Sequence, residues 1–176
     1  MTKGNYQKPM LVGDSMIEFF DWQERFADLE VNNLGRSGES VEELRIRAQD
    51  IVERYGAPDL VLVMIGTNNV AMENFTFQSA YEDILATFQE AYPEAALVVN
   101  SLLPMELGYL APDTVSRINS SLKSLAGGSD FFYLDAWSPM VDKSGRVLEG
   151  LLEDEVHLSY QGYRVWADVL AEFLQD

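Results

Sequence analysis

Short apolar runs alternate along this chain with longer segments in which apolar residues recur every three or four positions. The short runs predict buried strands, and the longer segments predict amphipathic helices. The predicted strands cover residues 9–12, 31–34, 60–65, 96–99 and 131–134. The run over 60–65 is apolar on both faces, which is typical of a central parallel strand that helices cover on each side.

Helix signals fill the intervals between these strands. Ser40 and Glu43 have the spacing of a capping box, and the helical stripe behind them ends at Gly56. Further apolar stripes predict helices over 77–92, 112–127 and 163–173. Alternation of strands and helices predicts an α/β fold, a three-layer αβα sandwich with a five-stranded parallel sheet and right-handed crossovers. No repeat or linker interrupts the pattern, so we expect a single domain over residues 1–176.

Composition narrows the class of protein. The chain has 176 residues, of which 47% are hydrophobic, enough to bury a sizeable core. Its formal net charge of −17 argues against a nucleic-acid partner and against docking on an anionic membrane. No apolar run approaches the ~20 residues of a membrane-spanning helix. A neutral or cationic small-molecule substrate fits this charge, and the sequence allows a homo-oligomer.

The absence of cysteine removes disulfides, thiolate metal sites and a cysteine nucleophile together. Residues 1–8 are polar and lack the apolar core of a signal peptide. We therefore expect a cytoplasmic protein, provided that no signal peptide has been removed ahead of this sequence.

Gly13-Asp14-Ser15 follows the first predicted strand and precedes an amphipathic segment. It therefore predicts a tight turn between a strand and a helix that begins at or just after Ser15. In open parallel sheets, ligands bind at the carboxyl ends of strands, where this turn lies. Ser15 is either a nucleophile or only a helix cap, and the tripeptide by itself favours the cap.

Other polar loops are predicted to meet this turn. Gly35 and the loop Gly66-Thr67-Asn68-Asn69 follow parallel strands, so they lie at the same edge of the sheet. His157 is the only histidine, and a serine nucleophile needs such a base. Asp154, three residues earlier, can orient that base. The N–H groups of Ser15 and Gly35 and the side-chain amide of Asn68 are candidate donors to an oxyanion.

Each of these residues has a simpler interpretation when taken alone. Gly35 is then a turn glycine, Asn68 caps a loop, Asp154 belongs to a solvated acidic run, and His157 lies on the surface. Only the joint arrangement of these residues favours a catalytic site over the simpler interpretations. Two arginines of the same region, Arg36 and Arg47, are expected to form ion pairs in so acidic a protein.

At these residues the sequence resembles the SGNH (GDSL) hydrolase family, from Val12 to about Trp166. Gly13-Asp14-Ser15 is similar to the first block of the family, Gly35 to the second, Gly66-Thr67-Asn68 to the third and Asp154 to His157 to the last. The context of the second block, the Gly-Thr-Asn block and Arg47 are most similar to the platelet-activating-factor acetylhydrolase-like branch.

Four residues, in three places along the chain, depart from the family pattern. Asn69 stands where aspartate often follows the third block, Glu155-Val156 replaces the usual Gly-Leu before the histidine, and Met16 replaces leucine after the serine. Since Asn68 carries the implied oxyanion role, we expect hydrolysis to survive these changes.

The resemblance implies a flavodoxin-like fold and a serine esterase that forms an acyl-enzyme. In that mechanism Ser15 attacks, His157 removes its proton, Asp154 orients His157, and Ser15, Gly35 and Asn68 hold the oxyanion. No metal or organic cofactor is needed. The expected substrate is a short-acyl or acetyl ester of a sugar or small lipid. The alternatives are a lysophospholipase or thioesterase of the same family, and a non-catalytic flavodoxin-like binding module.

Overall fold

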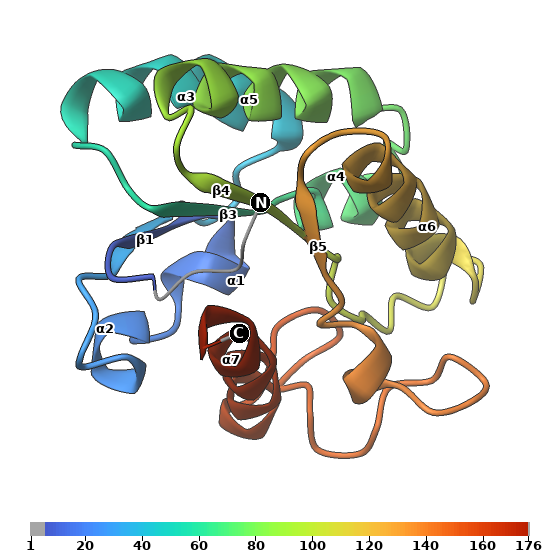
Figure 1. The fold of residues 1–176 in the computed structure, drawn as a ribbon. Coiled ribbons are helices and arrows are strands. Elements are labelled where there is room, and N and C mark those ends of the chain that lie inside the picture. Colours follow the sequence, from blue (N-terminus) through green and yellow to red (C-terminus); the bar gives the residue numbers. More distant parts are fainter. Residues whose placement is uncertain (1–5, 176) are drawn as a thin grey trace.

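The computed structural model describes residues 6–175, and five parallel strands form one sheet at its centre (Figure 1). The strands are β1 (Pro9–Gly13), β2 (Asn32–Gly35), β3 (Leu60–Met64), β4 (Ala96–Asn100) and β5 (Phe132–Leu134). Their order across the sheet is β2-β1-β3-β4-β5, and every neighbouring pair is parallel. This is the flavodoxin-like order, so the predicted fold class is confirmed.

Helices cover both faces of the sheet. They are α1 (Ser15–Glu18), α2 (Trp22–Arg25), α3 (Val41–Arg54), α4 (Thr67–Ala71), α5 (Gln78–Ala91), α6 (Thr114–Gly127) and α7 (Tyr160–Gln175), with a 3₁₀ turn over Ser138–Met140. In Figure 1, α3 and α5 lie over one face and α1, α2 and α7 lie under the other. The sheet is therefore the middle of three layers.

The chain changes direction between β1 and β3. From β1 it moves to β2 at one edge of the sheet, and α3 then carries it back across to β3 on the other side of β1. In such sheets the crevice at the switch point is where ligands bind. Gly13 allows β1 and β3 to approach each other here, because a Cβ on it would lie 1.9 Å from the carbonyl oxygen of Met64.

The core lies on both sides of the three central strands. Every residue of β1, β3 and β4 is buried, which accounts for their uninterrupted apolar runs. Trp166 of α7 is fully buried, and its indole N–H donates to Asn100 Oδ1 at 3.0 Å. The amphipathic stripe predicted for the last helix therefore faces the sheet.

The predicted elements are present, with boundaries that differ by one to three residues. The capping box is confirmed: the backbone N–H of Ser40 donates to Glu43 Oε2 at 2.8 Å, and that of Glu43 donates to Ser40 Oγ at 3.3 Å. The prediction of a loop over 66–69 is wrong, because α4 begins at Thr67. Gly66 has φ +123° and precedes the helix, so its turn signal marked a helix start.

Candidate active site

Ser15 is the first residue of α1 and lies directly after the carboxyl end of β1. The helix cap is Asp14, whose Oδ1 accepts the backbone N–H of Met16 at 3.0 Å. Since Asp14 fills the capping position, the Ser15 hydroxyl is not needed there. Ser15 is 4% exposed, and its Oγ lies 3.3 Å from His157 Nε2, a contact between residues 142 positions apart.

His157 is held from its other nitrogen by Asp154. Nδ1 lies 2.8 Å from Asp154 Oδ2, while Asp154 Oδ1 accepts the backbone N–H groups of Val156 and His157 at 2.7 and 2.6 Å. These hydrogen bonds lower the pKa of Asp154 to about 2, and the bond from the His157 N–H has the largest effect. An ionised carboxylate only accepts, so neutral His157 carries its proton on Nδ1 and leaves Nε2 free to accept from Ser15.

The loop that carries Asp154 and His157 is tied to its surroundings by backbone bonds. The N–H of Glu153 donates to the His157 carbonyl at 2.9 Å, and Leu152 forms an isolated antiparallel bridge with Leu158. From the loop after β4, the N–H of Glu106 donates to the Glu155 carbonyl at 2.7 Å. The loop therefore presents His157 to Ser15 in a defined position, over the edge of the sheet where the sequence predicted it.

Asn68 lies at the start of α4, beside the loop over residues 36–39 that connects β2 to α3. Its Nδ2 donates to the Glu39 carbonyl at 3.0 Å. A primary amide has two N–H bonds, so one remains for another acceptor. The backbone N–H of Ser15 has no hydrogen-bond partner within residues 6–175. Both groups are therefore available to an anion at the switch point.

Gly35 is placed differently from the other predicted donors. Its N–H already donates to Asn33 Oδ1 at 3.0 Å. A Cβ at this position would lie 2.2 Å from the backbone N of Glu18, so glycine is required here for the close approach of α1 to β2. The close packing of α1 on β2 therefore explains the glycine at this position.

Gly38, which lies in the loop over residues 36–39, has, within residues 6–175, the free backbone donor that the sequence predicted for Gly35. Its φ is +77°, nothing lies within 4 Å of a Cβ built on it, and its N–H has no partner in the described part of the chain. The next residue, Glu39, is the one that Asn68 binds. The sequence Gly35-Arg36-Ser37-Gly38 held both glycines, but only the structure distinguishes them.

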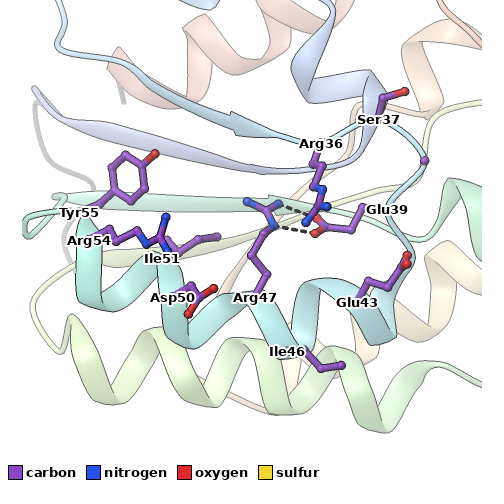
Figure 2. Close-up of a pocket in the computed structure, with 11 residues that line it drawn as sticks. Arg36, Ser37, Glu39, Glu43, Ile46, Arg47, Asp50, Ile51, Arg54 and Tyr55 are labelled. Carbon is purple, nitrogen blue, oxygen red and sulfur yellow. Dashed lines mark hydrogen bonds and ion pairs between the residues drawn. The ribbon is translucent and has the colours of Figure 1, made fainter.

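The loop is fixed from behind by a buried ion pair (Figure 2). Arg47 of α3 donates from Nε to Glu39 Oε1 at 2.6 Å and from Nη2 to Glu39 Oε2 at 2.5 Å, and Nη2 also donates to the Leu34 carbonyl at 3.0 Å. Glu39 is only 3% exposed. The ion pair predicted for Arg47 is confirmed, whereas Arg36 forms none within residues 6–175.

The loop and α3 also enclose a cavity of about 540 Å³, which Figure 2 shows. Three arginines and three acidic residues line it, so its formal charge is balanced: Arg36, Arg47, Arg54, Glu39, Glu43 and Asp50. Ser15 and His157 are not part of its lining, so the Ser15–His157 contact lies outside this cavity.

Within residues 6–175 no group of three or more histidine, cysteine, aspartate or glutamate side chains is arranged to hold a metal ion. None of the described helices is both long and apolar enough to cross a membrane.

Comparisons with known proteins agree with the geometry. The model of the GDSL-like Lipase/Acylhydrolase family matches residues 11–165. Platelet-activating factor acetylhydrolase IB subunit alpha1 from Bos taurus is 27% identical over 168 residues, which cover 92% of this chain and 72% of the relative.

Among solved structures, a GDSL-like lipase from Bacteroides thetaiotaomicron superimposes with a TM-score of 0.80 at 20% identity, covering 96% of this chain and 88% of the other. An acetyl xylan esterase variant from Geobacillus stearothermophilus gives 0.74 at 20% identity, with 99% and 97% covered. At these identities the structures show a shared fold.

Proposed function

The chain belongs to the GDSL-like lipase/acylhydrolase family, and on this premise we propose that it is a serine esterase that cleaves short-acyl esters through an acyl-enzyme on Ser15. The observation that carries this proposal is the continuous chain of contacts from Ser15 Oγ to His157 Nε2 and from His157 Nδ1 to Asp154. A nucleophile, a base and a group that orients the base are the parts that acyl transfer needs.

In the first half of the reaction Ser15 Oγ attacks the ester carbonyl, and His157 Nε2 takes the hydroxyl proton. Asp154 stabilises the resulting imidazolium, a role that its low pKa suits because the carboxylate stays ionised at neutral pH. The Oγ–Nε2 distance is 3.3 Å, and catalytic hydrogen bonds of this kind tighten as the transition state forms.

The negative oxygen of the tetrahedral intermediate needs donors around Ser15. We assign this role to the Ser15 N–H, the free N–H of the Asn68 amide and the Gly38 N–H. Gly38 replaces Gly35 in this assignment, because the Gly35 N–H is already bonded to Asn33. His157 then passes its proton to the leaving alcohol, and a water that it activates releases the acid. This mechanism needs no metal or organic cofactor.

The substrate class we propose is an acetyl or other short-acyl ester of a sugar or a small lipid. The names of the relatives support an acetyl group, since one is an acetylhydrolase and another an acetyl xylan esterase. A lysophospholipase or thioesterase would instead prefer long acyl chains or thioesters. A series of esters that differ only in acyl length separates these activities.

Labelling with a fluorescent fluorophosphonate tests the nucleophile and its base. We expect the native protein to be labelled, Ser15→Ala to be unlabelled, and His157→Ala and Asp154→Asn to react about 10²–10⁴-fold more slowly, as for other triads. Ser101→Ala is the matched control, because Ser101 is a buried serine outside this site, bonded to the N–H groups of Ala136 and Trp137. A folded native protein that takes no label contradicts the proposal and favours the non-catalytic binding module.

A further inference from the structure

Two large aromatic side chains are exposed near the candidate active site, and one of them contacts the ring of His157. Phe19, directly after α1, is 56% exposed, and its ring centroid lies 5.6 Å from that of His157. Tyr160, the first residue of α7, follows three positions after His157 and is 75% exposed. Other aromatic side chains of this protein are exposed as well, but these two line the same cavity and so provide apolar surface to a single ligand.

Phe19 and Tyr160 line one cavity of about 560 Å³. This volume lies within the range of about 300–1,000 Å³ that is usual for small-molecule sites. Phe20, whose ring stacks on Tyr163 at 5.0 Å, also lines it. Ser15 and His157 do not line this cavity; the ring of Phe19 lies between it and His157, and the cavity extends along α2 and the first half of α7.

The rest of the cavity wall is charged. Its remaining residues are Asp21, Glu24, Arg25, Arg164 and Asp168. Arg25 donates to Asp168 at 2.8 Å, whereas the guanidinium group of Arg164 forms no hydrogen bond or ion pair within residues 6–175. A lipid chain would bury these charges without partners, which is costly. A ring with hydroxyl groups would bond to them and place its C–H face on an aromatic ring.

The position of the cavity indicates which half of the ester occupies it. In the proposed mechanism His157 gives its proton to the oxygen of the leaving alcohol. That oxygen must therefore lie beside His157 Nε2, and the remainder of the alcohol extends away from Ser15 on the His157 side. Phe19 is the side chain that meets it there.

We propose that this cavity binds the alcohol half of the substrate, and that the alcohol is a sugar. The inference rests on the proposed esterase function and chooses between the two acetyl-ester classes named there. Phe19 and Tyr160 supply the apolar faces that the sugar ring contacts, and Arg164 supplies a free donor for its hydroxyl groups.

The experiment compares three acetyl esters: monoacetylated methyl β-glucopyranoside, cyclohexyl acetate and ethyl acetate. The first two have six-membered rings and differ in their hydroxyl groups, whereas the third has almost no alcohol to bind. Phe19→Ala, Tyr160→Ala and Arg164→Ala are measured with each ester. Tyr55→Ala is the control, since Tyr55 is a 40% exposed aromatic residue that follows the last residue of α3 and does not line this cavity.

We expect the native protein to prefer the sugar ester over cyclohexyl acetate. Phe19→Ala and Tyr160→Ala should raise KM for the sugar ester about five- to tenfold, with smaller changes for ethyl acetate, because aromatic contacts have this magnitude. Arg164→Ala should remove most of the preference over cyclohexyl acetate. Equal effects on all three esters, or a KM for the sugar ester that these variants leave unchanged, overturn the inference while the esterase proposal stands.

Binding separates this inference from the catalytic proposal. Ser15→Ala should bind the intact sugar ester in ligand-observed NMR, and Ser15→Ala/Phe19→Ala should lose most of that signal. A native protein that neither labels nor hydrolyses any ester refutes the catalytic proposal, and the NMR comparison then decides the sugar site on its own. Equal binding by the two variants refutes the sugar site.

Discussion

The turn after β1 places the carboxyl group of Asp14 in the protein interior, away from water. The residue is fully buried; its Oδ1 accepts the Met16 N–H, and within residues 6–175 its Oδ2 has no hydrogen-bond partner. Burial raises the pKa of Asp14 to about 6, with the Met16 bond acting in the opposite direction. Glycine-aspartate-serine is thus a turn in which the acid that caps the helix is also poorly solvated.

The titration of Asp14 predicts a pH dependence of stability. Its pKa is higher in the folded state than the usual 3.8, so the folded state binds more protons between about pH 4 and pH 6. The contribution of Asp14 is therefore most favourable below that window and is lost as pH rises through about 6. Asp14→Asn keeps the cap but removes the charge.

The free energy of unfolding of Asp14→Asn, relative to that of the native protein, should rise from pH 4 to pH 7 by up to about 3 kcal/mol. Urea unfolding at each pH measures the difference. Asp21→Asn is the control, because Asp21 caps α2 in an exposed position. A difference that is constant across the range, or one that falls, contradicts the predicted titration.

At the scale of elements, α3 serves the site through the loop that precedes it. Its capping box fixes the helix start, and Arg47, two turns further, reaches back to Glu39 and the Leu34 carbonyl. Glu39 in turn accepts the Asn68 amide. One helix therefore holds the loop of Gly38 and, through Glu39, the position of Asn68.

Arg47→Ala should lower both the stability of the fold and the rate at which Ser15 is labelled. It leaves the buried Glu39 carboxylate without its partner, which typically lowers the free energy of unfolding by about 3–5 kcal/mol. Because the loop of Gly38 is then released, the rate of labelling by the fluorophosphonate should also fall at temperatures where the variant is folded. Chemical denaturation and labelling rates measure the two effects.

Arg45→Ala is the matched control for Arg47→Ala. Arg45 lies on the same helix and pairs with Asp83 at 3.2 Å, but both side chains are at least half exposed. Such surface pairs contribute about 1 kcal/mol or less. If the two alanine variants lost equal stability and kept equal labelling rates, the buried pair would have no role in holding the loop.

At the scale of the whole molecule, the dominant feature is charge. Acidic residues outnumber basic ones 29 to 12, and the cavity beside His157 itself has three acidic and two basic residues in its wall. Repulsion among so many carboxylates opposes the compact state. The expectations of a single domain over 1–176, a cytoplasmic location and a homo-oligomer stay predictions.

Salt should therefore stabilise the fold. Raising NaCl from 0.01 to 1 M shortens the Debye length from about 30 to about 3 Å, so repulsion between distant carboxylates is screened. We expect Tm at pH 7 to rise, with most of the increase below about 0.2 M, where screening changes fastest. Sucrose at the same osmolality is the control, since it does not screen charge. A Tm that stays level or falls over this range contradicts the prediction.

The sequence by itself determined the architecture and predicted most of the candidate site. Apolar runs specify buried strands through a local property, and parallel strands bring their following loops to one edge whatever the details of packing. The sequence therefore predicted, before any distance was known, which residues lie together at this edge: Ser15, Asn68, Asp154 and His157. Four short sequence motifs, in the order of the family pattern, also indicated the family, and the match of the family model confirmed it.

The tertiary structure alone decided between groups of the same chemical type. Gly35 and Gly38 look alike in the sequence, but whether an N–H is free depends on which side chain lies beside it, and Asn33 occupies only the first. The burial of Glu39 depends in the same way on contacts with Arg47 and Asn68, which are not its neighbours in the sequence. The aromatic cavity at Phe19 belongs with them, because neither exposure nor the neighbourhood of His157 is a local property of the chain.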